Sequence, residues 1–225
     1  MPIFKTKNKD FFKKWSSKMA YILGFFCADG SMIKNKRGAH FIDFQITDGD
    51  LLFKIRKTLG SNHKIGIRKK KSVNESTVYK LQIGSKDFYN DLLKLGLKSR
   101  KTKRLNLPKV PAKYFSDFIR GYFDGDGNVI ARMYKRKVRD NKTFKILRSG
   151  FTSGSKKFLA EIKNKLLKIG IVKGCTFYYS NNAWRLYFSI NDSQRLYSYM
   201  YNKQSVKNGL FLKRKKIIFE SFIKK

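Results

Sequence analysis

The sequence predicts an α+β fold built from two pseudo-symmetric repeats, and three observations point to it. The first is an internal repeat, because the segment YILGFFCADG at residues 21–30 returns as FIRGYFDGDG at residues 118–127. The second is that similar strand and helix patterns follow each copy. The third is the segment LPKVP at residues 107–111, which marks a linker. We therefore divide the chain into an N-terminal repeat, residues 1–105, and a linker with the C-terminal repeat, residues 106–225.

The first half is expected to follow the order α-β-β-α-β-β-α around an antiparallel sheet. Its middle helix is predicted from apolar residues on one helical face between Leu51 and Leu59, with Asp48 or Asp50 as N-cap and Gly60 after its end. The elements expected are a helix that ends at the Asp-Gly pair of the repeat, strands 31–34 and 39–47, the middle helix, strands 64–68 and 78–83, and a helix over 86–95.

The second half repeats this order. Its elements are a helix that ends at the second Asp-Gly pair, strands 129–134 and 143–152 around a polar stretch near Arg139, a helix capped by Ser155, strands 175–179 and 184–190, and helices 194–201 and 211–222. Alternation in the last strand predicts one face on the core and one facing a polar partner. The residues expected on the core face are Trp184, Leu186, Phe188 and Ile190.

The charge of the chain restricts the class of partner. Lys and Arg number 52 against 15 Asp and Glu, which gives a formal net charge of +37. So large a positive charge favours a polyanion as partner, and the phosphate backbone of a nucleic acid is the commonest one. A membrane is the rival, but the chain has no apolar run of about 18 residues and no secretory signal pattern. We expect an intracellular protein, in the cytoplasm or in an organelle.

A hydrophobic content of 41% and an aromatic content of 15% provide enough core material for a folded protein. The soft ligands Cys27, Cys175, His40 and His63 form no short pair of the kind that a zinc site needs. We therefore expect the two cysteines to be buried thiols in a reducing compartment.

The repeated segment carries the chemistry. Gly24 and Gly121 place a small residue at the centre of an apolar helix surface, so that the two helices can pack closely. Each helix is then expected to end at its Asp-Gly pair, with the glycine at positive φ. Close packing would bring Asp29 and Asp126 together, and two facing carboxylates favour a divalent cation such as Mg²⁺ between them.

A single Asp-Gly pair would more often be a simple helix end, but its repetition favours a functional site. The segment from Asp124 to Asn128 also resembles the start of an EF-hand loop. That loop needs glycine at its sixth position and glutamate at its twelfth, where this chain has Val129 and Lys135. The segment is therefore not an EF-hand loop.

Residues Ile22 to Gly30 and Ile119 to Gly127 resemble the two motifs of the monomeric LAGLIDADG homing endonucleases. This resemblance implies a saddle of two curved sheets, joined through the motif helices, on double-stranded DNA. It implies cleavage across the minor groove of a long site with short 3′ overhangs, and use of Mg²⁺, with Mn²⁺ as a substitute and Ca²⁺ supporting binding without cleavage. It assigns the metal to Asp29 and Asp126 and to the backbone carbonyls of Ala28 and Gly125.

The resemblance also implies residues that order water around the metal. They are Gln45 and Lys101 in the first half and Lys215 in the second, where Thr152 is the nearest match to Gln45. Since the two sets differ, we expect the two sites to cut their strands at different rates. Arg120 stands at a normally apolar motif position, and we expect it on the solvent side of its helix.

Alternate residues of the sheets are expected to face DNA. These candidates for DNA contact are Ser31, Ile33, Asn35, Arg68, Lys80 and Gln82 in the first half, and Asn128, Ile130, Arg132, Tyr134, Arg148, Arg185 and Tyr187 in the second. For any one of them a phosphate or solvent contact is the commoner outcome.

Two other functions compete with the endonuclease. An intron maturase would use the positive surface for its own intron RNA, a role compatible with DNA cleavage by the same chain. A DNA-binding regulator on the same scaffold would keep the packing glycines and lose the carboxylates, so the retention of Asp29 and Asp126 opposes it.

Overall fold

The computed structural model describes residues 5–70, 72–73, 75–99, 101–135, 143–202, 206–207 and 209–223. The polar stretch expected near Arg139 lies outside the described residues, and so does the side chain of Tyr134.

Both halves have the predicted order of elements. The first half consists of α1 (Ser17–Asp29), β1 (Gly30–Lys34), β2 (His40–Ile46), α2 (Gly49–Thr58), β3 (Ile65–Arg68), β4 (Val78–Gly84) and α3 (Lys86–Lys94). The second consists of α4 (Phe115–Asp126), β5 (Gly127–Lys135), β6 (Thr143–Ser153), α5 (Lys156–Lys168), β7 (Thr176–Ser180), β8 (Ala183–Phe188), α6 (Ile190–Met200) and α8 (Lys213–Ile223). Short 3₁₀ turns lie between the halves, over Lys101–Lys103 and Ala112–Tyr114.

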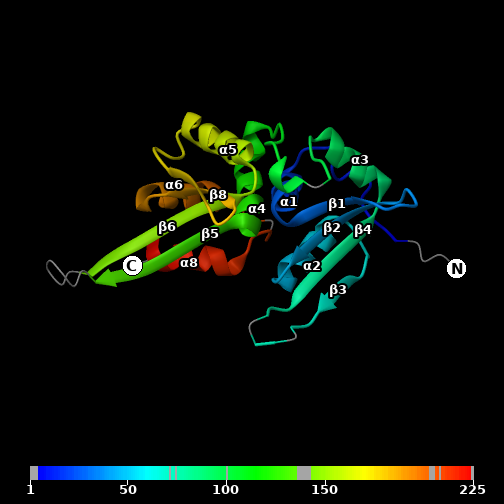
Figure 1. The fold of residues 1–225 in the computed structure, drawn as a ribbon, viewed down its shortest axis with the longest axis horizontal. Helices are drawn as coiled ribbons and strands as arrows, with labels where there is room; N and C mark the ends of the chain where they lie inside the picture. Colours follow the sequence, from blue (N-terminus) through cyan, green and yellow to red (C-terminus); the bar gives the residue numbers. More distant parts are fainter. Residues whose placement is uncertain are drawn as a thin grey trace.

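The two sheets have the same topology. Their strand orders are β1-β2-β4-β3 and β5-β6-β8-β7, and every pairing is antiparallel. Figure 1 shows the halves on either side of the adjacent helices α1 and α4, with β5 and β6 extended as a long ribbon. The predicted pair of pseudo-symmetric repeats is therefore confirmed.

Each sheet buries one face under helices. In the first half Ile42, Phe44, Leu81 and Ile83 are fully buried, while the alternate residues Gln45 and Gln82 are exposed. Within the described residues, no helix is long and apolar enough to cross a membrane.

The two halves meet at the glycines of α1 and α4. A Cβ atom added at Gly24 would overlap the backbone carbonyl of Phe118, and one added at Gly121 would overlap the carbonyl of Tyr21. The helix backbones are therefore in direct contact, as the sequence predicted, and only glycine permits that approach.

The glycines that follow the helices are needed for a reason that differs from the prediction. Gly30 and Gly127 have φ of −93° and −85°, in the extended region, so the expected positive φ is wrong. A Cβ atom at these positions would instead overlap the rings of Phe26 and Phe123, which fold back over the ends of their helices. Glycine is needed at these two positions because a side chain would not fit, and not because of the backbone conformation.

The expectation that Arg120 faces solvent is also wrong. Its side chain is 0% exposed and donates to the Asp117 carboxylate at 2.7 Å and to the carbonyls of Met200 and Leu210 at 2.9 and 3.1 Å. These contacts join α4 to the end of α6 and to the segment before α8. An arginine is tolerated because its Nε, Nη1 and Nη2 atoms each donate to an oxygen acceptor.

Two smaller expectations also fail. Ile190 begins α6 and is 36% exposed, because β8 ends at Phe188 instead of continuing along the core. Asp48 precedes α2 without a side-chain cap hydrogen bond. Ser155 does cap α5 as expected, by accepting from the N–H of Phe158 at 3.3 Å.

We expect Gly121→Ala to lower the free energy of unfolding by about 3 kcal/mol, because the added methyl meets backbone that no rotamer change can move. The melting temperature should fall by roughly 10 °C. Gly174→Ala is the matched control, since nothing lies within 4 Å of the added Cβ atom there. Equal melting temperatures for the two variants would show that α1 and α4 do not touch at Gly121.

Arg120→Met should lower the free energy of unfolding by about 3–5 kcal/mol, because it leaves a buried carboxylate and two buried carbonyls without their hydrogen-bond donor. Arg195→Met is its control: the Arg195–Asp192 pair has the same spacing and the same 2.7 Å distance, but the arginine side chain is 40% exposed. That variant should lose less than about 1 kcal/mol. Chemical denaturation measures both, and equal losses would contradict the structural role of Arg120.

Candidate functional site

The two motif carboxylates lie at the adjoining ends of α1 and α4. Asp29 is the last residue of α1 and Asp126 the last of α4. A Cβ atom added at Gly125 would overlap that of Ala28 and would lie 3.0 Å from the Oδ2 atom of Asp29. The helix ends are therefore packed together, and both carboxylates are partly buried.

Burial and mutual repulsion disfavour the charged forms of this pair. Burial and then the neighbouring Asp126 carboxylate raise the pKa of Asp29 to about 6, while Lys215 and Lys101 oppose the rise. Burial also raises the pKa of Asp126, again against the two lysines. A cation between the carboxylates would relieve both effects, so their environment fits a divalent metal.

The described part of the chain contains no cluster of three or more His, Cys, Asp or Glu residues that could hold a metal. Asp29 and Asp126 would thus form an incomplete ligand set, of hard oxygens, that needs further oxygen from a substrate or from water. This is the usual pattern for Mg²⁺, which keeps several waters and binds substrate phosphates.

Two buried lysines hold the ends of the motif helices. Lys101 Nζ donates to the carbonyls of Cys27 and Ala28 at 2.6 and 3.1 Å. Lys215 Nζ lies 2.6–3.1 Å from four carbonyl oxygens, those of Phe123, Asp124, Gly125 and Gly127. Burial lowers the pKa of Lys101, and it lowers that of Lys215 to about 8.

These lysines occupy the same place in both halves. A positive charge at a helix C-terminus interacts favourably with the helix dipole and with carbonyls that lack an intrahelical partner. The carbonyls of Ala28 and Gly125, proposed as metal ligands, each accept one lysine N–H, and each oxygen retains a second lone pair.

Gln45 lies beside Asp29. Two cavities, of about 370 and 250 Å³, open next to this carboxylate, and Gln45 lines both. Lys101 lines the larger one, and Arg214 of α8 lines the smaller one. In the second half, the carbonyl of Thr152 accepts from the Tyr122 hydroxyl at 2.6 Å. The surroundings of the two carboxylates therefore differ.

The first sheet turns the candidate residues to one face. Its register pairs Ser31 with Asp43 and Asp43 with Gln82, while Gln45 pairs with Lys80 in the adjacent row. Paired residues project from the same side of a sheet, and this is the side away from the core. Ile33 and Arg68 share it through their pairs Phe41 and Val78. The Asn35 side chain accepts from the Ala39 N–H at 2.8 Å, within the turn after β1.

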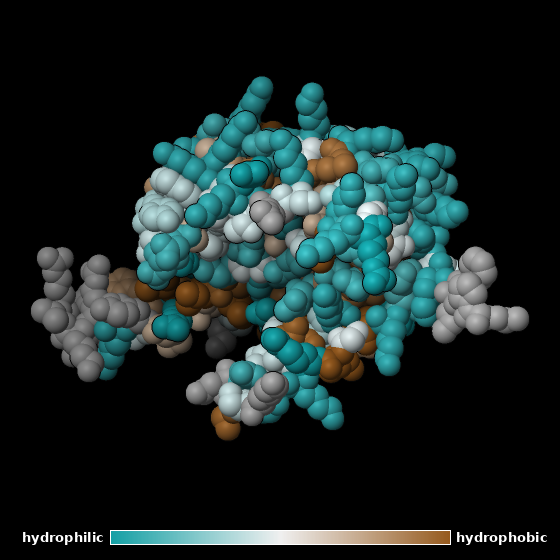
Figure 2. All heavy atoms as spheres, turned by 45° about the vertical axis from the view of Figure 1, so that its right-hand side comes forward, coloured by the Kyte–Doolittle hydropathy of each residue, from teal (hydrophilic) through white to brown (hydrophobic). Residues whose placement is uncertain are grey.

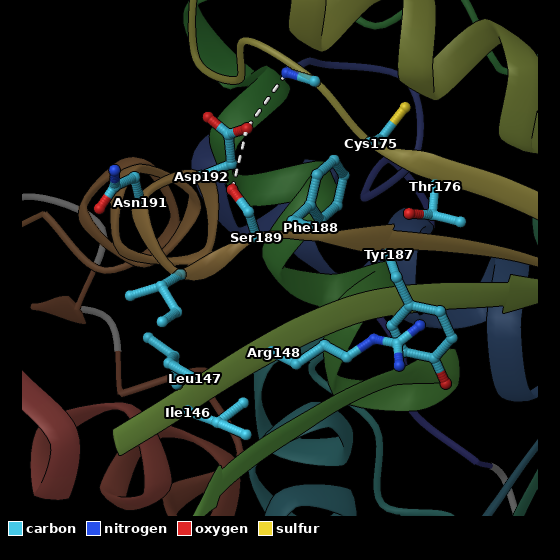
Figure 3. Close-up of a pocket in the computed structure, with 12 residues that line it drawn as sticks. Ile146, Leu147, Arg148, Cys175, Thr176, Tyr187, Phe188, Ser189, Asn191 and Asp192 are labelled. Carbon is cyan, nitrogen blue, oxygen red and sulfur yellow. Dashed lines mark hydrogen bonds between the residues drawn. The ribbon is translucent and has the colours of Figure 1, made fainter. Parts of the chain in front are cut away.

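The second sheet does the same. Asn128 pairs with Gly150, and Gly150 with Tyr187; the Asn128 amide donates to the Tyr187 hydroxyl at 2.7 Å. Figure 3 shows Arg148 against the Tyr187 ring, where its guanidinium carbon lies 4.0 Å from the ring centroid. Register places the remaining candidates on this face as well: Ile130, Arg132, Arg185 and the backbone of Tyr134.

Another cavity has neither Asp29 nor Asp126 in its lining. It measures about 720 Å³ and lies between β6, β8 and the start of α6, with Arg148 and Tyr187 on one wall. Asp192 on its opposite side accepts from the N–H groups of Lys173 and Gly174 at 2.9 and 3.1 Å. The Asp192 carboxylate thus holds the loop at Lys173 and Gly174.

Much of the surface is hydrophilic, as Figure 2 shows, with a hydrophobic strip beside the β5–β6 ribbon. Large apolar side chains on that ribbon are 40–68% exposed; they are Ile130, Met133, Phe144 and Ile146. Ile130 and Ile146 lie on the same face as Arg148, so the outer face of this sheet mixes apolar and basic groups.

Three residues near the site were missed by sequence reasoning. Asp43 is 5% exposed, pairs with Lys80 at 3.0 Å, and has an Oδ1 atom without a partner among the described residues. Counting back by two from Gln45 would have found it. The signal for Tyr122 is its hydroxyl, since the matching residue of the first repeat is Phe25. The signal for Arg214 is its place directly before Lys215, which matches the place of Arg100 before Lys101.

Comparison with known proteins agrees with this arrangement. The family described as LAGLIDADG-like domain matches residues 16–96 and 115–202, one match in each half. The uncharacterized protein MJ0398 of Methanocaldococcus jannaschii is 23% identical over 219 residues, which are 96% of this chain and 74% of that protein.

Solved structures show the same fold. The homing endonuclease I-WcaI bound to its DNA recognition sequence superposes with a TM-score of 0.60 at 16% identity, covering 94% of this chain and 91% of that one. I-SmaMI bound to an uncleaved DNA target in the presence of calcium ions gives a TM-score of 0.52 at 13% identity, covering 88% and 86%. Two motif matches and one shared architecture place this chain in the LAGLIDADG family, with the fold of its monomeric, two-repeat homing endonucleases.

Proposed function

We propose that the chain is a site-specific endonuclease that hydrolyses both strands of a long DNA site across the minor groove and leaves short 3′ overhangs. The observation that carries this proposal is the Asp29–Asp126 pair, partly buried where the two motif helices end between two sheets whose outer faces carry polar and basic side chains. The relatives I-WcaI and I-SmaMI, which bind DNA, support it.

Asp29 and Asp126 would hold Mg²⁺, with Ala28 and Gly125 offering carbonyl oxygens. When bound, the metal would lower the pKa of a water molecule and neutralise charge on the scissile phosphate. The protein's own contribution is to keep two carboxylates at a separation that they would not adopt unaided. The glycine contact between α1 and α4 and the lysines at the helix ends supply that constraint.

Gln45 and Lys101 are proposed to orient water on the Asp29 side. Gln45 is exposed and lines both cavities there. Lys101 uses two of its three ammonium hydrogens on the carbonyls of Cys27 and Ala28, so one remains for water in the larger cavity. Lys215 was predicted to act in the same way in the second half, and its four carbonyl contacts support a role in fixing the end of α4.

The outer faces of the sheets are proposed to follow the DNA. The net charge of +37 suits contacts with DNA phosphates. The affinity for DNA should therefore fall steeply as the salt concentration rises. Arg148, which lies over the Tyr187 ring, is suited to a guanine edge or a phosphate, and Ile130 and Ile146 are suited to thymine methyl groups.

The proposal is tested by selection. Duplexes from a randomised library are enriched by binding in Ca²⁺, and the bound fraction is then transferred to Mg²⁺. We expect enriched duplexes to be cut on both strands in Mg²⁺ and to stay intact in Ca²⁺. Enrichment of a sequence without any cutting would instead favour a DNA-binding regulator, and preferential binding of intron RNA would favour a maturase.

Asp29→Asn and Asp126→Asn should each abolish double-strand cleavage, because each removes a proposed metal ligand. Affinity for the enriched duplex should stay equal or rise slightly, since a negative charge near the phosphates is lost. Cleavage and binding are measured on the same duplex. Asp50→Asn is the control, because it changes the net charge equally at an exposed carboxylate on α2 that lies outside the cavities. Double-strand cutting by either motif variant would refute the assignment.

In EDTA, Asp29→Asn should raise the melting temperature by roughly 3 °C, which corresponds to about 1 kcal/mol of relieved repulsion. Ca²⁺ should stabilise the wild-type protein through binding to the folded state, and should stabilise the variant less. Thermal denaturation with and without Ca²⁺ measures both effects. A lower melting temperature for Asp29→Asn in EDTA would argue against the unfavourable carboxylate pair.

A further inference from the structure

Lys215, the lysine expected to act in the second half, is surrounded by four carbonyl oxygens. An ammonium group has three hydrogens, and Lys215 has four carbonyl acceptors within 3.1 Å. Its side chain is buried, with 5% exposed. A lysine held in this way cannot turn towards a substrate without breaking the support of the α4 end.

The preceding residue on α8 has the opposite properties. The Arg214 side chain is 57% exposed and lines the 250 Å³ cavity together with Asp29 and Gln45. Its Nε atom donates to the Asp48 carboxylate at 3.1 Å, across the boundary between the two halves. Among the described residues, its remaining N–H groups have no hydrogen-bond acceptor, so they are available to a ligand.

We propose that Arg214 is a catalytic residue that binds the phosphate cleaved on the Asp29 side, and that Asp48 holds it in place until DNA arrives. This inference rests on the proposed function. Arg214 is contributed by the second half to a cavity whose other polar groups come mainly from the first, so the site is completed across the pseudo-two-fold axis.

The chemistry of the guanidinium suits this role. Its planar fork can donate two parallel hydrogen bonds to two phosphate oxygens. Donors positioned where negative charge develops in the transition state accelerate cleavage more than they tighten binding. Removing Arg214 should therefore affect the rate of cutting more than the affinity for DNA.

Asp48 has the properties of a temporary anion partner. It precedes α2 but makes no side-chain cap hydrogen bond there, so its carboxylate is not needed for the helix. It is 27% exposed, and an exposed pair of this kind contributes little stability. A phosphate can therefore replace it at small cost.

The first experiment follows each strand of the selected duplex separately in Mg²⁺. Arg214→Ala should slow one strand about 100-fold, and Arg214→Lys should recover part of that loss. Gln45→Thr, which alters the same cavity, should slow the same strand. Lys213→Ala is the matched control, because it removes an exposed positive charge from the adjacent position of α8.

Affinity in Ca²⁺ separates catalysis from binding. Arg214→Ala should weaken binding less than about 5-fold, close to the effect of Lys213→Ala. Asp48→Asn should tighten binding more than Asp50→Asn, although both remove one carboxylate from the start of α2. The excess should vanish in the Arg214→Ala background, as a double-mutant cycle would detect.

The outcomes are distinct. One slowed strand, shared by the Arg214 and Gln45 variants, supports the inference. Two results for Arg214→Ala would overturn the inference: wild-type cutting rates on both strands, or equal slowing of both strands with a matching loss of affinity. Neither result would contradict the proposed endonuclease function. A wild-type protein that cuts no selected duplex would overturn the proposed function and this inference together.

Discussion

The contact between α1 and α4 is the constraint on which the rest of the molecule depends. Gly24 and Gly121 let two helix backbones touch, and this contact joins two sheets that would otherwise be separate units. It also fixes the distance between Asp29 and Asp126, since each carboxylate is carried by the last residue of its helix. Packing between apolar surfaces thus supplies the free energy that holds two mutually repelling groups together.

Positive charge at the helix ends moderates this repulsion. Lys101 and Lys215 are buried beneath the carboxylates and satisfy carbonyls that the helices leave without partners. Burial lowers the pKa of both lysines, while their charges oppose the rise in the pKa of the aspartates. The site therefore retains both carboxylates in a form able to take a cation, within a structure that would be more stable with fewer buried charges.

The repeats share a backbone but differ in their side chains. The row next to the carboxylate contains Asp43 in the first half and Gly150 in the second, where the absence of a Cβ lets the Tyr187 ring lie across the strand. Motif position six is Cys27 in one copy and Asp124 in the other, and Asp124 accepts from the Tyr21 hydroxyl of α1 at 2.6 Å. A symmetric scaffold thus carries two unequal surfaces, as recognition of an asymmetric partner would require.

The sequence by itself determined the repeat, the order of elements, the glycine contact and the pair of aspartates, because helical and strand periodicity and a repeated motif are local patterns. It also identified the outer faces of the strands, since side chains alternate strictly. Only the tertiary structure decided the environments of single polar residues. Arg120 is buried because distant carbonyls at Met200 and Leu210 meet it, and Arg214 reaches the Asp29 cavity because α8 returns to the boundary between the halves. Such partners are far apart in the chain, and the spacing of residues contains no record of which long-range contacts will satisfy a charge.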